Sequence, residues 1–148
     1  MFETFGEFDS YLEINMAAEG LKEEGDLKSL RKLAKENGLQ DFVEDYMNGD
    51  LPELCNVFTA AIGKLEVEKK DADKWGVFAD DIADYLASHC DDVEFAAAVR
   101  KMGKRIKTAA ARVEAEAKKN RISIPGGTCN YCGPMKGYQL IRDYYREG

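Results

Sequence analysis

Two cysteines separated by two residues form the most recognisable chemical spacing in the chain. Cys129 and Cys132 are followed by Gly133, and such a C-x-x-C pair can bring two thiolates to about 2.3 Å from one zinc ion. A closed structural zinc site needs four ligands, and the remaining candidates, His89 and Cys90, are neighbours whose side chains point apart on a regular helix. The pattern therefore favours a loop with two free thiols, with a zinc site and a redox dithiol as the alternatives.

The motifs that mark common enzyme active sites do not occur in the sequence. The single histidine, His89, has no Ser or Cys nucleophile motif around it, and the sequence holds no Walker-type phosphate loop, no HExxH and no dinucleotide-binding glycine pattern. Carboxylate pairs are always available among 28 acidic residues, but no pair is marked as buried. The sequence therefore predicts a protein that is not an enzyme and that uses neither a metal nor a cofactor.

Charged residues are segregated along the chain. Residues 1–98 hold 24 acidic and 9 basic side chains, whereas residues 99–148 hold 4 acidic and 12 basic ones. An acidic and a basic surface can each attract an oppositely charged macromolecule over about 8–10 Å at ordinary salt. The alternative is a solvated surface on which the two signs neutralise each other.

The acidic candidates for a partner-binding surface come from residues 36–53 and 71–94. Carboxylates in these stretches could imitate a row of phosphates in front of a basic groove of a partner. The candidates are Glu36, Asp41, Glu44, Asp45, Asp50, Asp80, Asp81 and Asp84.

The basic candidates lie in one predicted helix. Side chains three or four residues apart on a helix lie about one turn apart and can follow a phosphate backbone. The basic candidates are Arg100, Lys101, Lys104, Arg105, Lys107 and Arg112. Nearby tyrosines could stack on bases or could be core residues; they are Tyr131, Tyr138, Tyr144 and Tyr145.

Apolar residues recur at spacings of three and four from Asp9 to about Lys119, which predicts an all-α fold. We expect one domain, a compact bundle of about six to seven helices. It comprises a main bundle over 1–121, a loop rich in Gly, Pro and Cys over 122–134, and a C-terminal helix within 135–148. The predicted helices cover about 11–21, 27–37, 40–47, 51–69, 73–88, 92–119 and 135–146.

The sequence also predicts three details of these helices. The penultimate helix, over 92–119, is the longest, and its basic side chains fall largely off its apolar stripe. Trp75 is expected on the apolar stripe of the 73–88 helix. Gly63 inside the 51–69 helix predicts a mild weakness of about 1 kcal/mol relative to Ala.

The location is expected to be the cytoplasm. The N-terminal residues show no basic stretch before an apolar run, and no segment approaches the ~18 apolar residues of a membrane span. Four cysteines in such a chain are expected to stay reduced, without disulfides. The sequence carries no signal for an oligomeric state.

Short motifs spread over nearly the whole chain carry a resemblance to a known family. They are Phe5-Gly6-Glu7-Phe8-Asp9-Ser10, Glu24-Gly25-Asp26-Leu27, Ala34-Lys35-Glu36-Asn37-Gly38 leading to Glu44-Asp45-Tyr46, Gly63-Lys64-Leu65-Glu66-Val67-Glu68, and Ile141-Arg142-Asp143-Tyr144-Tyr145. The chain thereby resembles the PcfK-like family of conjugative and integrative elements and phages of gut Firmicutes. Members of that family are identified as type II-A anti-CRISPR proteins that inhibit the nuclease Cas nine.

The resemblance implies a non-enzymatic inhibitor whose partner is a type II CRISPR effector nuclease, alone or with its guide RNA or target DNA. Such a nuclease holds nucleic acid in a positively charged channel, which a small acidic protein could occupy. The alternative is a nucleic-acid-binding accessory protein of a conjugative or phage element that acts through the basic residues 100–121. A third hypothesis is a structural partner protein without a nucleic-acid role.

Overall fold

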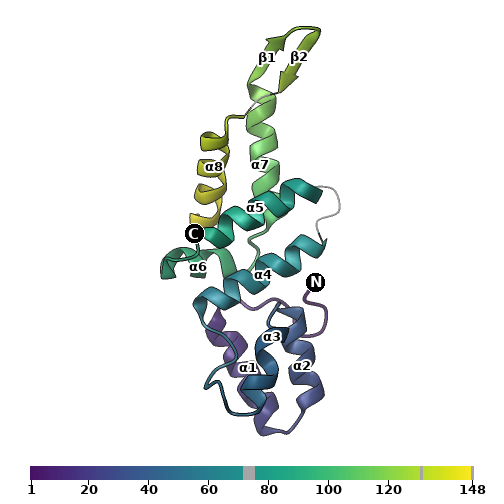
Figure 1. Ribbon diagram of the computed structural model, residues 1–148, viewed down its shortest axis with the longest axis vertical. Helices are drawn as coiled ribbons and strands as arrows, with labels where there is room; N and C mark the ends of the chain where they lie inside the picture. Colours follow the sequence, from purple (N-terminus) through teal and green to yellow (C-terminus); the bar gives the residue numbers. More distant parts are fainter. Residues whose placement is uncertain (72–75, 131, 148) are drawn as a thin grey trace.

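Eight helices and one hairpin make up the regular structure of residues 1–71, 76–130 and 132–147, the residues that the computed structural model describes. The elements are α1 (Tyr11–Glu23), α2 (Leu27–Glu36), α3 (Gln40–Met47), α4 (Val57–Asp71), α5 (Gly76–Ser88), α6 (Val93–Arg100), α7 (Ile106–Lys119), β1 (Arg121–Ile124), β2 (Gly127–Asn130) and α8 (Pro134–Arg146) (Figure 1). The all-α prediction is confirmed. Trp75, Tyr131, the start of the predicted helix at residue 73 and the side chain of Cys129 lie outside the described part of the chain.

Local capping sets the starts of α1 and α2, which agree with the predicted starts at about 11 and 27. The Ser10 hydroxyl accepts a hydrogen bond from the Glu13 N–H at 3.4 Å, and the Glu13 carboxylate accepts one from the Asp9 N–H at 2.8 Å. The Asp26 carboxylate accepts one from the Ser29 N–H at 3.1 Å. These bonds satisfy N–H groups that have no partner within the helix. Because the bonded residues lie close together in the sequence, the sequence pattern was sufficient to predict both helix starts.

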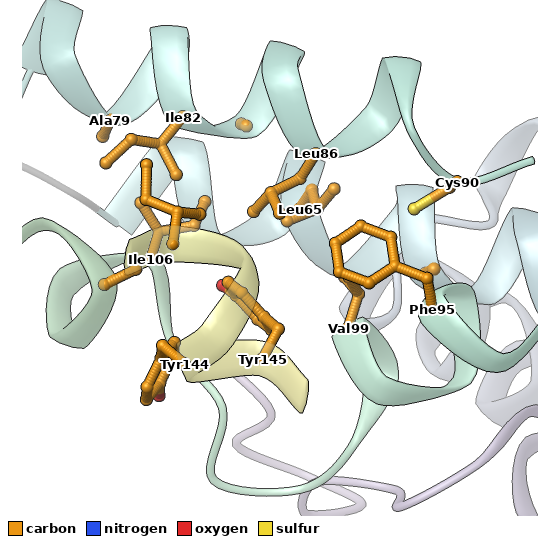
Figure 2. Close-up of a cluster of buried hydrophobic side chains, with 14 of the residues drawn as sticks. Leu65, Ala79, Ile82, Leu86, Cys90, Phe95, Val99, Ile106, Tyr144 and Tyr145 are labelled. Atoms are coloured by element: carbon orange, nitrogen blue, oxygen red, sulfur yellow. The ribbon is translucent and has the colours of Figure 1, made fainter. Parts of the chain in front are cut away.

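Two clusters of buried apolar side chains share helix α4. The first lies among α1, α2 and α3 at one end of the elongated molecule, and the second lies among α4 to α8 (Figures 1 and 2). Ala60 belongs to the first cluster, whereas its neighbour Ala61 and Leu65 belong to the second. Helix α4 therefore joins the two ends of the molecule.

Helix α4 begins at Val57, so the predicted start at residue 51 is wrong. Asn56 and Thr59 form a reciprocal cap, in which the Asn56 side-chain oxygen accepts from the Phe58 and Thr59 N–H groups and the Thr59 hydroxyl accepts from the Asn56 N–H, all at 2.9 Å. The preceding residues are then free to turn, and Leu54 and Cys55 enter the first core cluster. The cap at Asn56 thus lies six residues after Asp50, the residue that precedes the predicted start.

The predicted long helix over 92–119 is wrong, because α6 and α7 are separate helices. Residues 101–105 connect them, and Gly103 takes a φ of +83°, a left-handed conformation that ends a helix. Met102, which lies inside the predicted helix, is 57% exposed in this connection.

A β-hairpin replaces most of the predicted loop over 122–134. Strands β1 and β2 are antiparallel, with Ile122 opposite Cys129 and Ile124 opposite Gly127. Pro125 and Gly126 make the turn, where Gly126 takes a φ of +92°. The alternation of Ile122, Ser123 and Ile124 is typical of a strand, and the Pro125–Gly126 pair that follows is typical of a hairpin turn. The predicted C-terminal helix over 135–146 is confirmed as α8.

The expectation that Gly63 is a mild weakness is wrong. A Cβ atom at Gly63 would lie 2.3 Å from the backbone oxygen of Asn37, and one at Gly38 would lie 2.2 Å from the backbone oxygen of Gly63. Helix α4 therefore packs backbone to backbone against the turn after α2, and only glycine permits this distance.

None of the helices in the described ranges is long and apolar enough to cross a membrane.

Candidate functional site

Arg100 is buried, which contradicts its predicted place on a basic surface. Its side chain is almost fully enclosed at 1% exposure, and its guanidinium donates to the Asn37 side-chain oxygen at 2.6 Å. Further hydrogen bonds reach the backbone oxygens of Phe8 at 3.3 Å and Ala60 at 3.4 Å. Arg100 therefore links α6 to α4, to the N-terminal segment and to the turn after α2.

Three further basic candidates also bind within the protein. Lys104 donates to the backbone oxygen of Tyr144 at 2.6 Å, and the two terminal nitrogens of Arg105 donate to the Glu7 carboxylate at 2.5 and 2.6 Å. Arg112 pairs with the Glu147 carboxylate through both terminal nitrogens. The remaining two candidates, Lys101 and Lys107, have exposed side chains. The six predicted residues consequently do not form one free basic surface.

The α6–α7 connection is held by two buried charges on α4 that the sequence reasoning missed. The Lys64 ammonium donates to the backbone oxygens of Val99, Arg100 and Lys101 at 3.1, 3.3 and 2.7 Å, and so caps the end of α6. The Glu68 carboxylate, one turn later, accepts from the Ile106 N–H at 2.9 Å at the start of α7. These two side chains explain why the helix breaks between residues 100 and 106.

Carboxylates of the N-terminal segment bind the same connection from the other side. Glu7 accepts from the Gly103 N–H at 3.2 Å and lies 3.3 Å from the Lys64 ammonium. Asp9 accepts from the Met102 N–H at 2.9 Å. The hydrogen bond from Arg105 and the charge of Lys64 lower the pKa of the Glu7 carboxyl, although burial opposes them as the largest single effect. This charged cluster connects α4 and the N-terminal segment to the α6–α7 connection, and it leaves little cationic surface near residues 100–105.

Glu68 is expected to give the protein a pH-dependent stability. Burial raises the pKa of its carboxyl above the ordinary 4.5. Just above pH 4.5 the folded chain therefore keeps a proton on Glu68 that the unfolded chain releases. This proton stabilises the folded state, and the stabilisation is lost as the pH rises further. Relative to Glu68→Gln, which keeps an oxygen for the Ile106 N–H, the wild type should lose free energy of unfolding as the pH rises from about 4.5 towards neutrality. Urea titrations of both proteins across this range measure the difference. A constant difference would contradict the raised pKa.

The acidic candidates divide into two sets, one that runs from the end of α2 through α3 to Asp50 and one on α5 (Figure 1). Glu44 is bound by Arg31 at 2.7 Å, the Glu36 carboxylate accepts from the Thr4 N–H at 2.6 Å, and Asp84 lies 3.4 Å from the Lys69 ammonium. The other carboxylates are exposed and pair with no cation in the described part of the chain. They are Asp41, Asp45 and Asp50 near α3, and Asp80 and Asp81 on α5.

A groove of about 770 Å³ lies between α1 and the turn that follows α3. Two large apolar side chains border it, Leu12 at 55% and Met16 at 73% exposure. Three carboxylates also line it: Glu19, Glu23 and Glu53. The groove thus combines apolar contact area with negative charge.

Lys22, the one cation among the groove residues, is already bound. Its ammonium donates to the backbone oxygen of Tyr46 at 2.9 Å and lies 4.5 Å from the centre of the Tyr46 ring. Burial raises the pKa of the Tyr46 hydroxyl, and the negative charges of Glu19 and Glu23 raise it further. The field inside the groove is therefore negative.

The far wall of the groove is fixed to α1 by one side chain. The Asn15 amide nitrogen donates to the backbone oxygen of Cys55 at 2.9 Å, and its oxygen accepts from the Cys55 N–H at 3.1 Å. This pair holds the segment that carries Pro52 and Glu53 opposite the exposed face of α1. The groove is consequently preformed.

Sequence reasoning missed most of this groove, although a signal was present. Leu12, Met16, Glu19 and Glu23 follow each other at spacings of four, three and four, which places them on one face of a helix. The core face of α1 contains Ile14 and Ala18 instead. The second stripe on α1 was therefore readable as an exposed apolar and acidic face.

The histidine and cysteine candidates are not brought together in the described structure. His89 Nδ1 lies 2.8 Å from the backbone oxygen of Tyr85, Cys90 is buried in the second core cluster, and Cys132 is half-buried beside α8. Among the described residues, no group of three potential ligands from His, Cys, Asp and Glu is close enough to hold a metal ion. The side chain of Cys129, the other cysteine of the C-x-x-C motif, lies outside the described part of the structure.

Cys55 and Cys90 are expected to resist alkylation in the folded protein. Burial raises the pKa of the Cys55 thiol to about 12 and that of Cys90 to about 11, so that almost no thiolate is present at about pH 8. Iodoacetamide labelling followed by peptide mapping should find both unmodified in buffer and both modified in concentrated guanidinium. Rapid native labelling of either would contradict its burial.

Comparisons with known proteins identify no relative: no protein-family model, curated protein or solved structure matches the chain. The likeness to the PcfK-like family therefore rests on the sequence motifs alone.

Proposed function

We propose that the chain is a non-enzymatic inhibitor of a type II RNA-guided DNA nuclease, and that it binds the nuclease through the acidic groove on α1. The proposal places its action in the cytoplasm of a bacterial cell. It combines the family resemblance of the sequence with one observation of the structure, the preformed groove that joins exposed apolar side chains to carboxylates.

The chemistry of the groove suits a basic surface of such a nuclease. The channel that holds nucleic acid in these enzymes is strongly positive, and carboxylates in a partner speed association and fix its orientation. Leu12 and Met16 add binding free energy beyond the charge attraction, because burying an apolar side chain of this size contributes about 1.5–3 kcal/mol. Glu19, Glu23 and Glu53 would replace phosphate groups in front of the cations.

Internal pairing of two basic residues also supports binding through an acidic surface. Within the residues 100–121 of the alternative, Arg100 is buried and Arg105 is bound to Glu7, so these two could contact nucleic acid only after their bonds break. The carboxylates of the groove need no such change.

Target cleavage in the presence of the protein tests the proposal. The nuclease, loaded with guide RNA, should cleave target DNA more slowly when the protein is in excess at about 50 mM salt, and inhibition should weaken towards about 200 mM because exposed charges are screened. The double variant Glu19→Lys, Glu23→Lys should need at least about tenfold more protein for the same inhibition. Lysines near the C-terminal end of a helix are favourable for its stability, so the variant is expected to fold.

The matched control changes the charge equally on the other acidic surface. Asp80→Lys, Asp81→Lys alters two exposed carboxylates of α5 and should inhibit like the wild type. Unchanged cleavage with excess wild type would refute the inhibitory function, whereas loss of inhibition only in the α5 variant would refute the groove as its site.

A further inference from the structure

The β-hairpin projects beyond the helices at the end of α7, opposite the end that carries α1 (Figure 1). All four residues of β1 are exposed. Ile122 and Ile124 lie on one face of the ribbon, at 40% and 45% exposure, while Arg121 and Ser123 lie on the other. The hairpin therefore contributes little to either core cluster and presents both faces to its surroundings.

The sequence around the hairpin contains cations but no carboxylates. From Ala117 to Arg142 the chain has five Lys or Arg residues and no Asp or Glu. Lys118, Lys119, Arg121 and Lys136 are all exposed. Lys118 lies 3.5 Å from Glu114 one turn earlier, a surface pair of the kind that contributes little energy. Residues 118–130 therefore have only cations among their charged side chains and complement a polyanion, while Glu114 and Glu116 lie just before them on α7.

We infer that residues 118–130, the hairpin arm, insert into the major groove of double-stranded DNA. Two strands lie about 4.8 Å apart, and a two-stranded ribbon fits the ~12 Å wide major groove of B-DNA. The cations at the base of the arm, Lys118, Lys119 and Arg121, then contact the phosphates that flank the groove. Ile122, Ile124 and Pro125 supply apolar contacts at the base edges, where such side chains are used in known modes of binding.

This inference goes beyond the proposed inhibitory function and is independent of it. The hairpin arm and the acidic groove lie at opposite ends of the molecule (Figure 1). Loss of one activity therefore need not change the other, and separate assays distinguish the two failures.

Binding to a duplex of about 20 base pairs, followed by fluorescence anisotropy at several salt concentrations, tests the inference. With three to four phosphate contacts, the logarithm of the affinity should fall with that of the salt concentration with a slope of about −2.7 to −3.6. The variant Lys118→Gln, Lys119→Gln, Arg121→Gln should bind at least about tenfold more weakly, with the slope reduced by about 2.7. The matched control, Lys28→Gln, Lys32→Gln, Lys35→Gln, removes three exposed cations from α2 and should bind like the wild type.

Hydrogen exchange supplies a second measurement that needs no variant. Adding the duplex should slow exchange of backbone N–H groups in residues 121–130 of the wild type and leave α2 unchanged. A single strand of the same sequence should compete at least about tenfold less well, since it has no groove. Absence of duplex binding, equal weakening in both triple variants, equal competition by the single strand, or protection elsewhere than at the arm would each overturn the inference.

Discussion

Lys64→Met is expected to lower the free energy of unfolding by about 3–5 kcal/mol, because it removes one partner from a buried network of charges. The variant keeps the length of the side chain but removes the ammonium donor from the backbone oxygens of Val99 and Arg100, while the Lys101 oxygen still accepts from the Lys104 N–H at 3.2 Å. It also leaves the Glu7 carboxylate without the ammonium 3.3 Å away. Burial lowers the pKa of Lys64 to about 8, so the ammonium is still mostly charged at neutral pH.

Guanidinium unfolding followed by circular dichroism measures this loss. Lys70→Met, on an exposed position of the same helix, is the control and should change the free energy of unfolding by less than about 0.5 kcal/mol. A loss below about 1 kcal/mol in Lys64→Met would mean that the network contributes little to joining α4 to the α6–α7 connection.

Gly63→Ala is the second change with a large expected effect, about 3 kcal/mol or more of lost stability. The added methyl group would lie 2.3 Å from the Asn37 backbone oxygen, and backbone atoms cannot yield as the end of a flexible side chain can. The loss should therefore reach or exceed the upper end of the usual 1–3 kcal/mol range for overpacking.

Gly20→Ala, in the interior of α1, is the matched control for Gly63→Ala. Among the described residues, no atom beyond its chain neighbours and the nearby backbone of α1 lies within 4 Å of the added methyl group, so this change should raise stability by about 0.5–1 kcal/mol. Opposite signs for the two substitutions in thermal unfolding are the expected result. A stabilising Gly63→Ala would contradict the close approach of α4 to the turn after α2.

Local signals in the sequence predicted the helices that depend on neighbouring residues. Ser10 and Asp26 cap α1 and α2 through bonds that span three residues, and these bonds are visible in the sequence pattern. The α6–α7 break depends on Lys64 and Glu68, which lie about 37 residues away in the chain. Helix periodicity alone could not reveal that break, because the pattern continues across it.

Burial of charge was the least predictable feature of the site. Arg100 looks like a surface cation on a helical wheel, but its partners Phe8 and Asn37 lie 92 and 63 residues away. The acidic groove was partly predictable, since the spacing of Leu12, Met16 and Glu19 places them on one face. Its opposite wall was not, because that wall depends on the hydrogen bonds between Asn15 and Cys55.

Calorimetric titration of the protein into the guide-loaded nuclease, at low and raised salt, measures most directly whether the acidic groove binds a type II nuclease. We expect saturable binding that weakens as salt is added and that falls at least about tenfold with Glu19→Lys, Glu23→Lys, whereas Asp80→Lys, Asp81→Lys should leave it unchanged. Absence of binding at low salt, or binding that the groove variant leaves at full strength, would contradict the proposed function.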